Sequence, residues 1–288
     1  MNHVWVGCWY NAPKYRFAIA AQEGTYVEDN YPEEPLGVRN VLEATLGFRL
    51  RRGKSIWVDA GVFPSHIGFE TAGSKTNWTL SRSVMAENSP YYLSGVKVSW
   101  KPNLYWEVVL AACNGWQRIY QNGKLLPALS SQVKFTQEKT IFNWSLFYGK
   151  VNTGHLLATR YFSNLYGQFF ATNKVGFIIA VDAGLQHERN HYYKWWTAVG
   201  TSQYQITPKL RSAARVEYFH DPAGVLTNPL NLTTVSGSIN IDYQFPSFLL
   251  LRIEARQFRN RTLPEGLLPD STTNLTISLI AEGTLLKK

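Results

Sequence analysis

The sequence contains no long hydrophobic run and comparatively little charge. No stretch of about 18 consecutive apolar residues occurs in the chain, and this excludes a membrane-spanning helix. Charged residues make up 17% of the 288 residues and apolar residues 45%, and such a charged fraction is low for a soluble domain. Cysteine is scarce, because Cys8 and Cys113 are the only two, and nothing in their positions supports a disulfide.

Two further sequence features are missing, a signal peptide and a basic patch. Residues 1–5 lack the basic and apolar regions of a signal peptide. The net charge is +9, yet lysine and arginine are spread singly along the chain. A nucleic-acid-binding surface needs a concentrated basic patch, so we expect no nucleic-acid partner.

What the sequence does contain is a two-residue alternation of apolar and polar side chains, clearest in residues 40–51. One face of this segment carries Leu42, Ala44, Leu46, Phe48 and Leu50, and the other carries Glu43, Thr45, Gly47, Arg49 and Arg51. Side chains of a β-strand alternate between its faces, so one face is apolar and the other is charged. A soluble β-sandwich alternates as well, but its polar face points to bulk solvent.

Fifteen strand-like segments follow one another along the chain. We expect them at residues 3–10, 15–22, 40–51, 55–62, 92–100, 104–113, 128–136, 140–149, 160–171, 175–186, 191–204, 209–219, 232–243, 247–258 and 273–282. Short connections alternate with long ones, as in outer-membrane barrels with short periplasmic turns and long outer loops. The 10 Trp and 16 Tyr residues suit a protein that meets two membrane–water interfaces.

These features predict an all-β fold, a transmembrane antiparallel β-barrel formed by residues 1–288 as one domain. The first short turn, at residues 11–14, places the start of the first strand on the outside. Bacterial barrels of one chain have an even number of strands. We therefore expect that fifteen of about 16 strands are visible, and that a signal peptide and one strand are missing upstream.

Several irregular motifs carry a family resemblance. They are residues 59–70 (DAGVFPSHIGFE), 80–83 (LSRS), 86–92 (AENSPYY) and 114–119 (NGWQRI). Together they resemble the OmpL-like β-barrel porin-2 family of Gram-negative bacteria, especially Bacteroidetes, over most of the chain. The resemblance implies a diffusion pore in the bacterial outer membrane, and members begin with a signal peptide and an additional leading strand.

The charged strand faces are the candidate functional surface. A charge facing mid-membrane lipid costs a few kcal/mol, whereas a charge facing a water-filled interior costs little. We therefore expect the pore to be lined by Arg16, Arg49, Arg51, Lys97, Lys134, Lys194, Arg211, Arg215, Arg252 and Arg256, and by Glu43, Asp59, Glu107, Asp182, Glu217, Asp242 and Glu254. These charges either pair across strands and solvate the interior, or, through their basic excess, lower the barrier for anions.

The longest connection, residues 63–91, has two interpretations. It either folds into the barrel, where Glu70, Lys75, Arg82 and Glu87 line a constriction opposite the wall arginines, or it forms a lid on the surface.

One motif suggests chemistry. His187, Glu188 and His191 match the H-E-x-x-H pattern of zinc proteases, which requires a helix to bring both histidines to one face. Strands are expected on both sides of this motif, so we interpret it as a hairpin tip. We expect no catalytic residues, no metal and no cofactor, and hence no enzyme.

Three functional hypotheses follow. The first is an outer-membrane porin, a passive channel for small hydrophilic solutes with weak anion preference, in contact with outer-membrane lipid. Assembly into a homo-oligomer stays open. The alternative is a soluble or surface-attached β-sandwich that binds carbohydrate through exposed aromatic residues. A membrane-embedded hydrolase is the third, and it is disfavoured because the sequence offers no credible catalytic triad.

Overall fold

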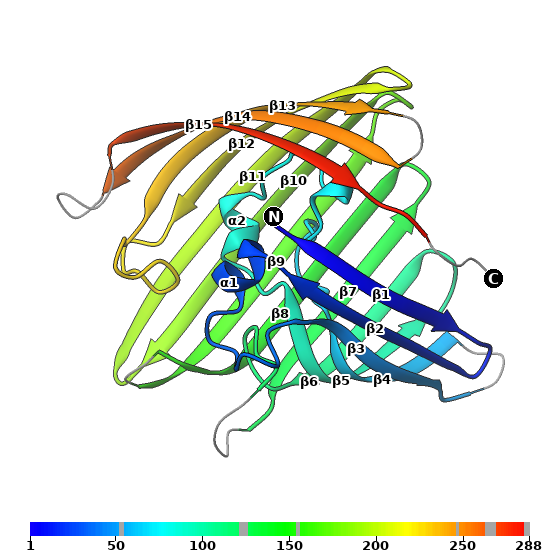
Figure 1. Ribbon diagram of the computed structural model, residues 1–288. Coiled ribbons are helices and arrows are strands. Elements are labelled where there is room, and N and C mark those ends of the chain that lie inside the picture. Colours follow the sequence, from blue (N-terminus) through cyan, green and yellow to red (C-terminus); the bar gives the residue numbers. More distant parts are fainter. Residues whose placement is uncertain (52–54, 121–125, 154–155, 246–247, 263–268, 285–288) are drawn as a thin grey trace.

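All fifteen expected strands are present in one antiparallel sheet, in which each strand pairs with its neighbours in sequence (Figure 1). The computed structural model describes residues 1–51, 55–120, 126–153, 156–245, 248–262 and 269–284. The strands are β1 Val4–Asn11, β2 Tyr15–Glu23, β3 Val41–Arg49, β4 Ser55–Pro64, β5 Tyr92–Lys101, β6 Trp106–Cys113, β7 Ala128–Gln137, β8 Thr140–Asn152, β9 Leu157–Phe170, β10 Val175–Glu188, β11 His191–Thr207, β12 Leu210–His220, β13 Thr233–Gln244, β14 Leu249–Thr262 and β15 Ser271–Ala281.

The two faces of the sheet are inverted relative to a soluble protein. On β13, the side chains of Ile239 and Ile241 are 63% and 49% exposed, whereas those of Asn240 and Asp242 are 1% and 2% exposed. The apolar face is therefore the outer surface and the polar face is enclosed, an arrangement that is stable only where lipid covers the outside. The alternative of a soluble β-sandwich is wrong, since a sandwich buries its apolar faces.

The sheet curls so that its edge strands, β1 (blue) and β15 (red), lie on the same side of the molecule (Figure 1). Within the described residues no ladder joins these two strands. The expectation of a sixteenth strand stays a prediction. None of the helices in the described ranges is long and apolar enough to cross a bilayer.

The long connections carry the helices. The helix α1, Thr25–Asn30, lies between β2 and β3, and the loop between β4 and β5 carries the 3-10 turn η1, Ser74–Thr76, and the helix α2, Val84–Glu87. Both α-helices lie within the curve of the sheet (Figure 1). We call residues 65–91 the interior loop, since they pack against the enclosed face of the strands.

Candidate functional site

The wall holds the interior loop mainly through the main chain of the loop. The amide of Ser81 donates to Glu254 on β14 at 2.5 Å, and the amide of Val84 donates to Glu217 on β12 at 2.6 Å. Nearer the start of the loop, the amide of Gly68 donates to the Asn164 side chain at 3.1 Å. The loop is thus fastened across the inner faces of strands far apart in sequence.

Arg215 is the centre of a buried ionic network under the interior loop. Its guanidinium is 0% exposed and lies 3.2 Å from Glu217, 3.3 Å from Glu254 and 3.6 Å from Glu70. It also donates to the main-chain oxygen of Ser81 at 2.7 Å. Because charges buried away from water are stable only when paired, this arginine connects two strands to the loop and does not face solute.

Arg252 and Arg256 act in the same way on β14. Arg252 is 0% exposed, binds Asp242 at 2.7 Å and donates to the main-chain oxygen of Asn77 at 3.0 Å. Arg256 pairs with Glu217. Arg211 also pairs with Asp242 and is 24% exposed. The predicted pore-lining residues of β12–β14 face inward as expected, but most are covered by the loop.

The four predicted constriction residues have different environments. Lys75 pairs with Glu282 beyond the end of β15 and is 41% exposed. Glu70 is buried and accepts hydrogen bonds from the amide and hydroxyl of Ser83, so it holds the loop together and cannot line a passage. Burial raises its pKa, an effect that Arg215 opposes. Its assignment to a constriction is therefore corrected, because its carboxylate points into the Arg215 network.

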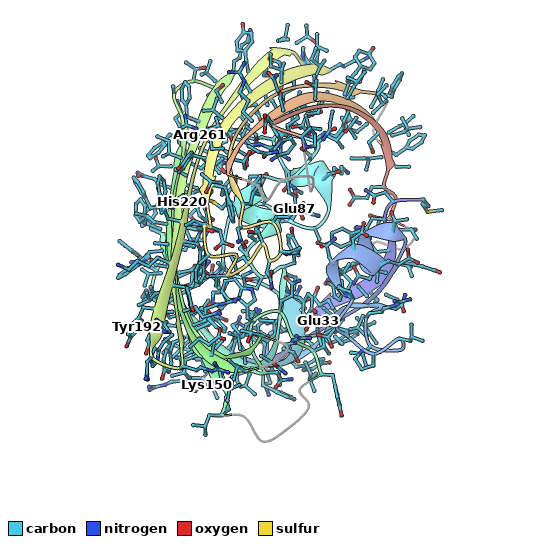
Figure 2. The ribbon with its side chains drawn as sticks, turned by 90° about the vertical axis from the view of Figure 1, so that its left-hand side faces the viewer. Glu33, Glu87, Lys150, Tyr192, His220 and Arg261 are labelled. Atoms are coloured by element: carbon cyan, nitrogen blue, oxygen red, sulfur yellow. The ribbon has the colours of Figure 1, made fainter. Side chains whose placement is uncertain are left out.

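Arg82 and Glu87 form a pair at 2.9 Å in which Glu87 keeps 42% of its side chain exposed. The Arg82 guanidinium lies between two rings, 4.7 Å from the centre of Tyr26 and 4.6 Å from that of Tyr91. Cation–π contacts of this kind hold an arginine in place, and here they join the loop of α1 to the interior loop. Figure 2 shows Glu87 inside the ring of strands.

His66 fixes the first turn of the interior loop to β7 and β8. Its ring contacts the Ser130 hydroxyl at 2.8 Å, and its main-chain oxygen accepts from Gln132 at 2.7 Å and Ser145 at 3.0 Å. Burial, with a smaller contribution from Lys97, lowers the pKa of His66 to about 4. The imidazole is therefore neutral at physiological pH.

The wall formed by β2–β7 is more accessible than the wall under the interior loop. Arg16 pairs with Asp59 at 2.5 Å and is 31% exposed. The rings of Trp57 are stacked against two guanidinium groups, at 4.4 Å from Arg16 and 4.9 Å from Arg49. Lys97 lies over the ring of Phe63 at 4.3 Å. Cations on this wall therefore remain partly open to the interior.

The other predicted residues of this wall also face inward. Glu107 is opposite Lys134 in the ladder between β6 and β7 and lies 3.5 Å from Lys101. Glu43 accepts a hydrogen bond from the indole of Trp9 at 2.9 Å. Farther round the barrel, on β10, Asp182 is buried and accepts from Asn164.

Two predicted pore-lining residues lie elsewhere. Lys194 is exposed on the outer face of β11, because it pairs with Leu185 and alternates with the buried Trp195. Both faces of this strand end carry aromatic residues, so the sequence pattern gives no indication of which face is inside. Arg51 lies beyond the end of β3 and not on the strand.

Sequence reasoning missed Arg160 and Glu34. Arg160 faces inward on β9, donates to Gln186 at 2.8 Å and lies 4.9 Å from the ring of Trp116. Its alternation with Tyr161 could have revealed it. Glu34 accepts from the Ile119 amide at 2.7 Å and joins two loops, and no sequence signal points to this role.

The H-E-x-x-H motif lies in a hairpin, as predicted. Glu188 is opposite His191 at the ends of β10 and β11, and His187 stacks on Tyr192 at 4.4 Å between ring centres. In the part of the chain that the structure describes, no three metal-ligating side chains come together.

Comparison with known proteins gives a family and a fold. The model of the family described as "Putative beta-barrel porin-2, OmpL-like" matches residues 1–282. No curated protein matches the chain. The anion-selective porin from Comamonas acidovorans has a TM-score of 0.63 at 8% identity, covering 97% of this chain and 85% of its own.

Two further solved structures share the fold. The outer membrane channel DcaP of Acinetobacter baumannii has a TM-score of 0.63 at 11% identity, covering 97% of this chain and 83% of its own. A loop L8 deletion mutant of OmpT from Vibrio cholerae has a TM-score of 0.64 at 11% identity, covering 97% of this chain and 89% of its own. With the match of the family model, the chain belongs to the OmpL-like beta-barrel porin-2 family and is a porin of the bacterial outer membrane.

Proposed function

We propose that this porin is a single-domain, passive diffusion channel for small hydrophilic solutes, with a weak preference for anions and no catalytic step. The observation that carries the proposal is an uneven balance of charge between two parts of the inner wall. An interior that is open to water and lined by excess cations lowers the electrostatic barrier for anions.

The accessible part of the wall has the positive excess. Within the described residues, the inward positions of β2–β7 carry five cations and three carboxylates, namely Arg16, Arg49, Lys97, Lys101 and Lys134 against Glu43, Asp59 and Glu107. Arg49, Lys97 and Lys134 have no carboxylate within ion-pair distance among these residues. They are therefore the cations best able to attract a passing anion.

The part of the wall under the interior loop is balanced. Inward positions of β8–β14 carry five cations and five carboxylates, namely Arg160, Arg211, Arg215, Arg252 and Arg256 against Asp182, Glu188, Glu217, Asp242 and Glu254. Because the central arginines are buried in ion pairs, they contribute little field to the passage. This difference supports a weak preference and not a strong one.

Replacing two of these three unpaired cations tests the proposal. In planar bilayers under a KCl gradient, we expect the wild type to give a reversal potential of the sign that indicates a higher permeability for chloride than for potassium. In the double variant Arg49→Gln/Lys97→Gln, this potential should shift in the direction that indicates a lower ratio of chloride to potassium permeability. A matched control is Arg259→Gln, which removes a cation from the outer face and should leave the potential unchanged. Cation preference in the wild type would refute the proposed selectivity.

A homo-oligomer is a further proposal for the porin. One OmpT structure of Vibrio cholerae is described as a trimer form, with a TM-score of 0.58 at 11% identity, which supports self-assembly in this fold. Light scattering of the purified chain in detergent, corrected for bound detergent, should give a mass above that of one 32.8 kDa chain.

A further inference from the structure

The outer face of the barrel carries its cations in one region only. In the strands that the structure describes, outward-facing Lys150 on β8, Lys194 on β11 and Arg259 on β14 all lie within four residues of the loop end of their strand. Outward positions of β1–β7 carry no lysine or arginine in these residues. The short-turn ends of the strands have no outward cation either.

These outward cations lack protein carboxylates. The ion pairs of the described residues include none of Lys150, Lys194 and Arg259, and on β8–β14 no outward position carries an acid. Lys150 donates to the Thr159 hydroxyl at 2.6 Å. The inward arginines of β12 and β14, by contrast, each have an acidic partner.

The cations lie at the level where a membrane protein meets lipid headgroups. Aromatic side chains mark this level, and Lys194 is flanked on its face by Tyr192 and Trp196. In Figure 2, Lys150, Tyr192 and His220 follow one another along one wall of the barrel. Lysine and arginine near an anionic membrane surface are attracted to lipid phosphates.

An apolar groove lies directly beside this region. It has a volume of about 1110 Å³, and its lining includes Lys194, Trp196, Leu185, Ala183, Tyr148 and Tyr161. The groove opens on the outer face, where Lys194 supplies a positive charge at an otherwise apolar lining. An acyl chain fits the apolar part, and a phosphate fits the charged part.

We propose that the loop end of the outer face of β8–β14 binds a phosphorylated lipid, with its phosphate on Lys194 and an acyl chain in the groove. Lys150 and Arg259 lie three strands away on either side, which is about 14 Å at the usual strand spacing. Lys150 and Arg259 would therefore bind the phosphates of other lipids in the same leaflet. Charge complementarity selects this occupant over a second copy of the chain, whose matching face carries the same positive charges.

Lipid binding to the full chain in detergent micelles, measured by native mass spectrometry, tests the proposal. The probes are diphosphorylated lipid A, its dephosphorylated analogue with the same acyl chains, and inorganic phosphate. The variant Lys150→Gln/Lys194→Gln/Arg259→Gln should bind lipid A about a hundredfold more weakly than the wild type, since each basic residue near anionic lipid contributes about 1 kcal/mol. The control variant Lys139→Gln/Lys174→Gln/Lys209→Gln removes three charges from the short turns and should bind as the wild type does.

Equal affinity of the triple variant and the wild type, or of lipid A and its dephosphorylated analogue, would overturn the phosphate site. Displacement of lipid A by millimolar inorganic phosphate would overturn the lipid assignment, and loss of a dimer or trimer in the triple variant would identify a subunit interface instead. Ala183→Phe, which fills the groove, should weaken lipid A binding. An unchanged affinity for lipid A would overturn the proposal that an acyl chain binds in the groove. Unchanged single-channel conductance of each variant shows that it is folded.

Discussion

Arg215 shows how one side chain can serve the structure of a pore without touching the solute. It is completely buried and lies within 3.6 Å of three carboxylates. The sequence placed it on the pore wall by its strand face, and this face is correct. Which wall cations remain exposed depends on where a loop far away in sequence folds, and strand periodicity contains no information on that.

Replacing Arg215 by methionine should destabilise the protein strongly. The variant would leave Glu70, Glu217 and Glu254 buried without their shared cation, and breaking such a network costs about 3–5 kcal/mol. Denaturant unfolding of the protein in detergent measures the loss. In the control Arg211→Gln, Asp242 keeps its contact with Arg252, so we expect a loss of about 1 kcal/mol or less. Equal losses in both variants would contradict the central position of Arg215.

His66 gives the interior loop a dependence on pH. Its pKa is lowered from 6.5 to about 4 in the folded protein, so the unfolded or undocked chain binds a proton more readily. The stabilisation from the neutral ring is complete above pH 6.5 and decreases as the pH falls toward 4. Below that value it should change no further.

Limited proteolysis of the interior loop between pH 7.5 and pH 4 tests this dependence, with an acid-tolerant protease and a correction for its activity at each pH. We expect cleavage of the wild type to increase as the pH falls. His66→Gln should reduce the change, because glutamine does not titrate. The idea is wrong if the variant and the wild type show the same pH profile.

At the level of elements, the strand pattern was the part of the fold that the sequence predicted well. Each of the fifteen expected segments is a strand, since lipid outside and water inside impose a two-residue period along every strand. The pattern failed at Lys194, where Tyr192, Tyr193, Trp195 and Trp196 give both faces the same character. Local sequence cannot assign a face when the alternation is lost.

Close packing between β10 and β11 depends on a glycine. A Cβ atom at Gly184 would lie 1.9 Å from the ring of Trp195, which is 2% exposed. Gly184→Val should therefore force this ring to move and cost about 1–3 kcal/mol. The control Gly237→Ala, on β13, adds a Cβ with no atom nearer than 3.8 Å, and it should be close to neutral. Thermal unfolding followed by Trp fluorescence compares the two variants.

At the scale of the whole molecule, the asymmetry of charge predicts how selectivity varies with salt. The screening length falls from about 10 Å in 0.1 M salt to about 3 Å in 1 M salt. A preference that arises from partly exposed wall cations, such as Arg49 and Lys97, should therefore weaken as salt rises. The anion-to-cation permeability ratio should approach one in 1 M KCl, and a ratio that is independent of salt would point to a dehydrated binding site instead.

The attachment of the interior loop by its main chain has a consequence for variation. Ser81 and Val84 are held through backbone amides, and Ser74, Asn77 and Arg82 are held through backbone carbonyls. These contacts of the barrel thus depend more on the position of the main chain of this segment than on the identity of its side chains. Relatives, or a protein engineer, could exchange exposed residues along it to reshape the aperture while the anchoring chemistry stays in place.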